Sequence, residues 1–272
     1  MTRSQPTVGP QSVICQNSGE HMWGGLSWNE HVDGDDCVLE LESGDIPATG
    51  GNAAAIPWNT DITYTKIIVS GHVTTTDNQS LFAGSSSSSL RIADVANLDT
   101  SDATTLRSFF SDQPNLTTIT GLGQWDTSNV TDMCNVFNGN STLTGTPGIE
   151  NWDTSNVTTM NRMFGFCPRL TRLNLSKHGK QWDTSKVTDM GNMFMNDAEL
   201  TTIGGPGLEI PPDANTAPCS TDAPNCYVAS NRVNISGPQA GRHSTGTNTT
   251  PKTPKAPPTV FLNWKAETFQ KS

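Results

Sequence analysis

The side chains best placed to do chemistry are aspartates that recur at a fixed place in a repeated segment. Asp126, Asp153 and Asp183 each stand second in that segment. Stacked above one another, they could form a ladder for calcium, which takes about six to eight oxygen ligands, together with nearby threonine hydroxyls. Alternatively, each aspartate caps the start of a helix by accepting hydrogen bonds from unpaired backbone N–H groups. We favour capping, because it satisfies each charge locally, whereas neighbouring like charges repel.

No other arrangement of residues indicates catalysis. No motif links the five histidines to a serine or a cysteine, and the G-x-S-x-G segment of serine hydrolases is absent. Carboxylates are plentiful, so a glycosidase-type pair stays open as an alternative, although no spacing selects one. The cysteines form no C-x-x-C pair, which disfavours zinc. We therefore predict a protein that is not an enzyme and needs no cofactor and no metal.

The segment that carries the aspartates repeats along the chain. Trp-Asp-Thr-Ser-Asn-Val-Thr occurs at Trp125–Thr131 and Trp152–Thr158, and again at Trp182–Thr188 with one substitution. A weaker copy begins at Leu98, so successive copies start 27, 27 and 30 residues apart. Repetition at this period indicates a stacked solenoid, in which no single unit buries its own apolar face. The repeat-defining residues, which we expect to be structural, are Trp125, Asp126, Met133, Phe137, Trp152, Asp153, Met160, Phe164, Trp182, Asp183, Met190 and Phe194.

Within one unit, the spacing predicts a helix followed by a strand. Val130, Met133 and Phe137 fall at i, i+3 and i+7, which is one face of a short helix. Leu170–Leu175 reads L-x-x-L-x-L, the spacing of a strand that lines a leucine-rich solenoid. The tryptophan that opens the next unit is expected to pack between neighbouring layers. The predicted fold is therefore an α/β, leucine-rich-repeat-like solenoid.

The rest of the chain divides around these repeats. Residues 1–20 read as a disordered leader and 21–79 as a small β-rich cap over the apolar end of the stack. Within the cap, Asp33–Asp36 indicates a hairpin turn, because its glycine supplies the positive φ that a tight turn needs. The repeats occupy 80–210, and a Pro- and Thr-rich linker or tail fills 211–272.

Charge and cysteine content bound the environment. The net charge is −10, and residues beyond Ser230 carry six basic groups and one acid, so the preceding chain carries −15. An acidic body disfavours nucleic acid as a partner, and no apolar run is long enough to span a membrane. Of the six cysteines, Cys15 could reach Cys37 and Cys219 could pair with Cys226, and the sequence leaves both pairings open.

The repeat W-D-T-S-N-V-T-x-M-x-x-M-F, followed by an L-x-x-L-x-L strand, resembles that of the BspA-like leucine-rich-repeat surface proteins of bacteria. The match is nearly complete over Trp152–Ser176 and extends across roughly residues 20–205. The resemblance implies a surface-held or secreted adhesin that contacts extracellular-matrix, mucin or other cell-surface macromolecules. The first ten residues lack the apolar stretch of a signal peptide, so secretion is expected from the resemblance alone.

We therefore predict a non-enzymatic, monomeric binding or adhesion protein. The alternatives are a truncated structural remnant that has no ligand, and a carbohydrate-active enzyme. Exposed side chains on the strand face of a solenoid recur at fixed intervals and suit extended partners. The candidate ligand-contact residues are Arg169, Thr171, Arg172, Asn174, Lys177 and Lys180.

Overall fold

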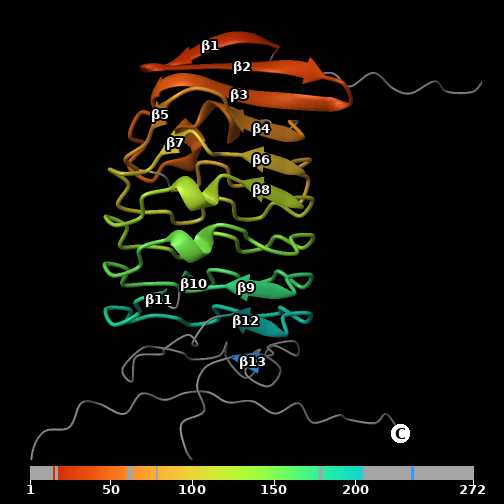
Figure 1. The fold of residues 1–272 in the computed structure, drawn as a ribbon. Helices are drawn as coiled ribbons and strands as arrows, with labels where there is room; N and C mark the ends of the chain where they lie inside the picture. The colour runs from red at the N-terminus through yellow and green to blue at the C-terminus, as the bar shows by residue number, and fades with distance from the viewer. Residues whose placement is uncertain are drawn as a thin grey trace, which may run out of the picture.

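The computed structural model describes residues 15, 18–59, 64–77, 79–177, 180–204 and 234–235. The chain winds into a β-solenoid whose coils are stacked, with short strands lying above one another along one side (Figure 1). Within these residues, the helical segments are 3₁₀ turns of three residues each, and no helix is long and apolar enough to cross a membrane. The expected leader (1–20) and tail (211–272) lie almost entirely outside the described residues.

The strands are short except at the N-terminal end of the stack. They are β1 (Gly19–Trp23), β2 (Leu26–Asp33), β3 (Asp36–Asp45), β4 (Lys66–Val69), β5 (Val73–Thr74), β6 (Ile92–Asp94), β7 (Leu98–Asp99), β8 (Thr118–Thr120), β9 (Arg172–Asn174), β10 (Ser176–Lys177), β11 (Lys180–Gln181), β12 (Thr202–Gly204) and β13 (Asn234–Ile235). The 3₁₀ turns are η1 (Ala53–Ala55), η2 (Pro57–Asn59), η3 (Leu122–Gln124) and η4 (Ile149–Asn151).

The pairing changes from antiparallel to parallel along the stack. β1, β2 and β3 form an antiparallel meander, and the hairpin expected at Asp33–Asp36 joins β2 to β3, with Gly34 at φ +60°. β3 then pairs in parallel with β4, followed by β6 and β8. Farther along, β9, β12 and β13 form a second parallel ladder. The meander therefore covers the end of the stack at which the coils begin.

The helix predicted in each repeat is absent, so the α/β leucine-rich-repeat assignment is wrong. The segment that holds Val130, Met133 and Phe137 forms consecutive turns. Its N–H groups alternate between two partners: Phe137 donates to Met163 O of the next coil at 2.9 Å, whereas Asn138 donates to Asn135 O at 3.1 Å. An α-helix would instead direct each N–H to the carbonyl four residues earlier. The side chains of Val130, Met133 and Phe137 still point inward here, because the turns recur every few residues.

We call this set of segments the turn strip: residues 80–84, 106–112, 133–139, 160–166 and 190–196. It depends on left-handed backbone at two places in each of its last four segments and at one place in the first. The non-glycine residues with positive φ in the described chain all belong to it: Ser80, Ser108, Asp112, Asn135, Arg162, Phe166, Asn192 and Asn196. Gly139 supplies the remaining φ, of +81°. Asn, Asp and Gly tolerate this conformation, whereas a bulky side chain does not favour it.

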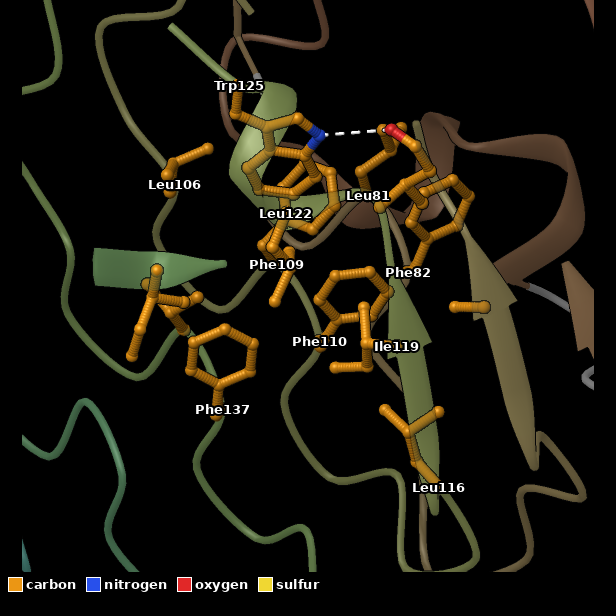
Figure 2. Close-up of a cluster of buried hydrophobic side chains, with 14 of the residues drawn as sticks. Leu81, Phe82, Leu106, Phe109, Phe110, Leu116, Ile119, Leu122, Trp125 and Phe137 are labelled. Carbon is orange, nitrogen blue, oxygen red and sulfur yellow. Dashed lines mark hydrogen bonds between the residues drawn. The ribbon is translucent and has the colours of Figure 1, made fainter. Parts of the chain in front are cut away.

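Two columns of aromatic rings fill the interior. Phe110, Phe137 and Phe164 stack at centroid separations of 6.2 and 5.5 Å, and Figure 2 shows Phe110 and Phe137 packed beside Trp125 and Phe109. The tryptophans that open the repeats form the second column, at 5.8 Å (Trp125–Trp152) and 6.2 Å (Trp152–Trp182). The expectation that these tryptophans pack between layers is confirmed. Each of their indole N–H groups also donates to the carbonyl oxygen of an earlier coil, at 2.8–3.1 Å.

Buried polar side chains link successive coils at one further position. Asn140 accepts a hydrogen bond from the N–H of Gln113 at 3.0 Å and donates to Phe110 O at 3.0 Å. In the next coil, Cys167 donates through Sγ to Phe137 O at 3.1 Å. Asp197 follows: its Oδ1 accepts from the N–H of Cys167 at 2.8 Å, and its buried Oδ2 has no partner within the described chain. An ionised carboxylate has no proton to donate at such a position.

Burial raises the pKa of Asp197 to about 8, which makes the stability of the stack pH-dependent. The unfolded chain releases this proton near pH ~4, whereas the folded chain retains it. The Asp197 contribution is therefore fully present below about pH 4 and is lost as the pH rises to about 8. We predict that Asp197→Asn, which restores an N–H donor, stabilises the protein at pH 8 and has little effect at pH 4. Urea unfolding at both pH values measures this difference.

Asn140 provides the matched control for Asp197. Asn140→Asp places an acid at the equivalent buried position two coils away, so it should destabilise the protein at pH 8 more than at pH 4. A pH dependence that is unchanged by Asp197→Asn would show that Asp197 is ionised in the folded state.

A disulfide joins Cys15 to Cys37, the pairing that the sequence left open. Cys134 and Cys167 are free and buried, while Cys219 and Cys226 lie outside the described residues. The bridge spans a sequence separation of 22 and ties residue 15 to β3. Closing a loop of this size restricts the unfolded chain, which stabilises the folded one by about 3 kcal/mol.

We therefore expect the double substitution Cys15→Ser and Cys37→Ser to lower the free energy of unfolding by about 3 kcal/mol. Denaturant titration measures the change, and reducing the unsubstituted chain should reproduce it. Equal unfolding midpoints for the oxidised and reduced chains would contradict the expectation. Cys134→Ser leaves the bridge intact, so reductant should destabilise this control variant as much as it destabilises the unsubstituted chain.

Candidate functional site

The outward side of β4, β6, β8, β9 and β12, which we call the strand face, carries most of the expected contact residues. In β9, Arg172 and Asn174 are exposed on either side of buried Leu173. The alternation follows from strand geometry, in which successive side chains point to opposite faces. Thr171 is exposed directly before β9, and Arg169 is exposed in the turn that leads into the strand. The structure thus brings these four residues together at one level of the stack.

The other two expected contact residues lie in a hairpin that directly follows β9 and contacts η4 of the preceding coil. β10 and β11 pair antiparallel, with Ser176 opposite Gln181 and Lys177 opposite Lys180. This hairpin accommodates the three extra residues of the repeat, and β9 and β12 on either side keep their register. The side chains of Lys177 and Lys180 lie outside the described residues, so only their backbone position is established.

The basic residues of the strand face differ in how they are paired. Near the N-terminal end, Arg91 contacts Asp36 at 2.6 Å and Lys66 contacts Asp33 at 3.8 Å. Hydrogen bonds from Thr65 and Arg91, together with the Arg91 charge, lower the pKa of the Asp36 carboxyl. Arg169 and Arg172 make no salt bridge with any part of the chain that the structure describes. Their guanidinium groups are thus free to pair with an anionic or hydrogen-bonding partner.

The repeated aspartates act as caps of turns. Oδ1 of Asp126 accepts a hydrogen bond from the N–H of Ser128 at 2.9 Å, and Asp153 and Asp183 do the same with the serine two residues on, each at 2.9 Å. The bond from Ser185 lowers the pKa of Asp183. Adjacent threonines link the coils, since Thr127 Oγ1 donates to Asp153 O at 2.9 Å. The capping interpretation is confirmed, with a turn in place of the expected helix.

A polar hollow of about 480 Å³ lies beside this column near the start of the repeats. His72 Nε2 stands 3.7 Å from Asp99, and Gln124 and Asp126 line the same hollow. A hydrogen bond from the Ser101 N–H, together with His72, lowers the pKa of Asp99. Among the described residues, no three His, Cys, Asp or Glu side chains converge as a metal site would require. The arrangement can accept hydrogen bonds.

A second surface, which the sequence did not indicate, runs along the edge of the turn strip. It is a groove of about 550 Å³ whose lining includes Phe166, Asp112 and Asn196. Phe166 is one of three large apolar side chains that are exposed in the described chain, the others being Met22 and Val32. The sequence signal that could have indicated this surface is Phe166, which stands at the repeat position held by Gly139 and Asn196 in the neighbouring coils.

Among the comparisons with known proteins, only the repeat region finds a match. Residues 76–203 match the model of a family described as a Mycoplasma protein of unknown function, DUF285. A search of the curated proteins finds no match. A search of the solved structures finds none either. The matched span covers most of the parallel coils and leaves out the antiparallel meander as well as β4 and β5.

The two interpretations of the aspartates make different predictions for Asp126. Asparagine caps as well as aspartate, so Asp126→Asn should leave the free energy of unfolding unchanged, whereas Asp126→Ala should lower it by about 1 kcal/mol. Thermal unfolding with added Ca²⁺ and with a chelator supplies the control. A stabilisation by Ca²⁺ that Asp126→Asn removes would contradict capping as the main role.

Proposed function

We propose that this protein is a non-enzymatic adhesion protein of the BspA-like type, presented at the cell surface or secreted. One observation carries the proposal: consecutive coils are aligned in register, so exposed side chains at the same repeat position form long rows along the stack. Such surfaces suit extended macromolecular partners, as in other solenoid proteins. Extracellular-matrix proteins, mucins and other cell-surface macromolecules are the partners we infer.

The strand face supports binding at the level of β9. Arg169 and Arg172 are exposed without an intramolecular ion pair in the described chain, while Thr171 and Asn174 add hydrogen-bonding groups beside them. Arginine is enriched in the energetically important parts of protein interfaces, because its planar group forms several hydrogen bonds at once. The hairpin of β10 and β11 follows β9 directly along the chain.

The Cys15–Cys37 disulfide supports the proposed location. Structural disulfides persist in oxidising compartments, and they are rare in the reducing cytosol of mesophilic organisms. The bond joins residue 15, ahead of the meander, to Cys37 in β3, so it ties the chain to the N-terminal end of the stack.

Binding of the full chain to immobilised extracellular-matrix proteins, mucins and bacterial wall polymers tests the proposal. We expect saturable binding to at least one of them. Replacing Arg169 and Arg172 together by alanine should weaken it by at least about tenfold, since hydrogen bonds to charged groups contribute about 1.5–3 kcal/mol each. Surface plasmon resonance on the folded variants measures the change.

Lys66 and Arg91 offer the matched control, because they lie on the strand face but are paired with Asp33 and Asp36. Their replacement by alanine should leave the affinity largely unchanged. Absence of saturable binding by the correctly folded chain across the whole panel would refute the adhesion proposal. Unchanged affinity of the Arg169 and Arg172 double variant would refute this placement of the contact surface.

A further inference from the structure

The groove beside the turn strip is built from the same position in successive coils. Five residues contribute, one from each coil: Gly84, Asp112, Gly139, Phe166 and Asn196. A second row stands two residues farther on, and it consists of Ser86, Pro114, Ser141 and Pro168. With neighbouring coils spaced like strands at about 4.8 Å, four steps give a groove about 19 Å long. That length suits a linear polymer lying parallel to the axis of the stack.

Phe166 stands out in this row against the preferences of the backbone. Its φ is +60°, a conformation that suits Gly139, Asn196 and Asp112, which occupy the equivalent positions. Its side chain is also 37% exposed and lines the groove. A bulky apolar residue held in a strained conformation and left open to solvent is a signature of function.

Most backbone N–H groups in the first row of the groove are already paired within the stack. The N–H groups of Asp112, Gly139 and Phe166 donate to the next coil, to Asn138 O, Gly165 O and Met195 O, at 2.6–2.8 Å. A peptide that binds by strand addition needs an unpaired strand edge, and these three positions present none. We therefore expect side chains to dominate recognition.

The side chains that remain suit a neutral, hydroxyl-rich ligand. Phe166 and the two prolines present flat apolar surfaces, whereas Ser86, Asp112 and Asn196 present hydrogen-bonding groups. The lining contains one carboxylate and no basic residue, so polyanions are repelled and not attracted. Sugar rings combine an apolar C–H face with a rim of hydroxyl groups, and sites of mixed lining of this kind bind ligands of mixed character.

We propose that the groove binds a linear, neutral glycan, with Phe166 packed against one sugar ring. The inference rests on the proposed function, of which it specifies one class of partner and a second contact surface. It places the glycan beside the turn strip, whereas the strand face serves the other partners.

Isothermal titration of the full chain with cellohexaose, xylohexaose, mannohexaose and maltohexaose tests the inference. At least one should bind with a stoichiometry of one, and hexagalacturonate, an anionic counterpart, should bind more weakly than its neutral equivalents. Phe166→Asn should weaken binding by about tenfold, the contribution of a well-packed ring. Because asparagine tolerates left-handed backbone, this variant should be at least as stable as the unsubstituted chain.

Two further variants separate the possible outcomes. Ser86→Arg adds bulk and charge at an exposed edge of the groove and should also weaken glycan binding, whereas Met22→Ser, which removes an exposed apolar side chain elsewhere, should not. Failure of all four neutral hexaoses to bind, or affinities of the Phe166→Asn and Ser86→Arg variants that equal the affinity of the unsubstituted chain, overturns the inference. Protein partners that still require Arg169 and Arg172 would then leave the adhesion proposal standing. Binding of a pool of proline-rich decapeptides that is lost with Phe166→Asn would assign the groove to peptides.

Discussion

Backbone hydrogen bonds between successive coils are the constraint on which the rest of this structure depends. Through them, residues one repeat apart face each other, as when Met133 donates to Thr159 O and Met160 to Asp189 O. A shift of one residue would turn each apolar side chain of the strands from the interior to the surface. The aromatic columns, the threonine links and the turn caps all require that this alignment is kept from coil to coil.

Alignment also explains why one position accepts chemically different residues. The interior site occupied by Gln113, Asn140, Cys167 and Asp197 requires a group that serves the backbone of a neighbouring coil. An amide does this with both of its atoms, a thiol donates only, and a carboxylate accepts only unless it is protonated. The carboxylate of Asp197 occupies this site in the last of these four coils.

The sequence predicted what depends on periodicity and missed what depends on the backbone. The repeat of Trp-Asp-Thr-Ser indicated a solenoid, stacked tryptophans and capping aspartates, and these follow from one residue type at one place in each unit. The helix was wrongly predicted, because the i, i+3, i+7 spacing of Val130, Met133 and Phe137 is compatible with tandem turns as well. The signal for turns was the recurrence of Asn, Ser, Asp and Gly at left-handed positions such as Asn135 and Gly139. The groove could not be predicted, since its rows exist only after the coils are aligned.

The hairpin of β10 and β11, where this repeat is three residues longer, shows that coil length can change without a change in the neighbouring coils. The extra residues are accommodated between Ser176 and Gln181, and β9 and β12 on either side still pair in register. Adding or removing a whole coil would likewise change each exposed row by one step of about 4.8 Å without altering its neighbours. The number of coils therefore sets the length of partner that the stack can span. The exposed residues in each coil set the kind of partner that it binds.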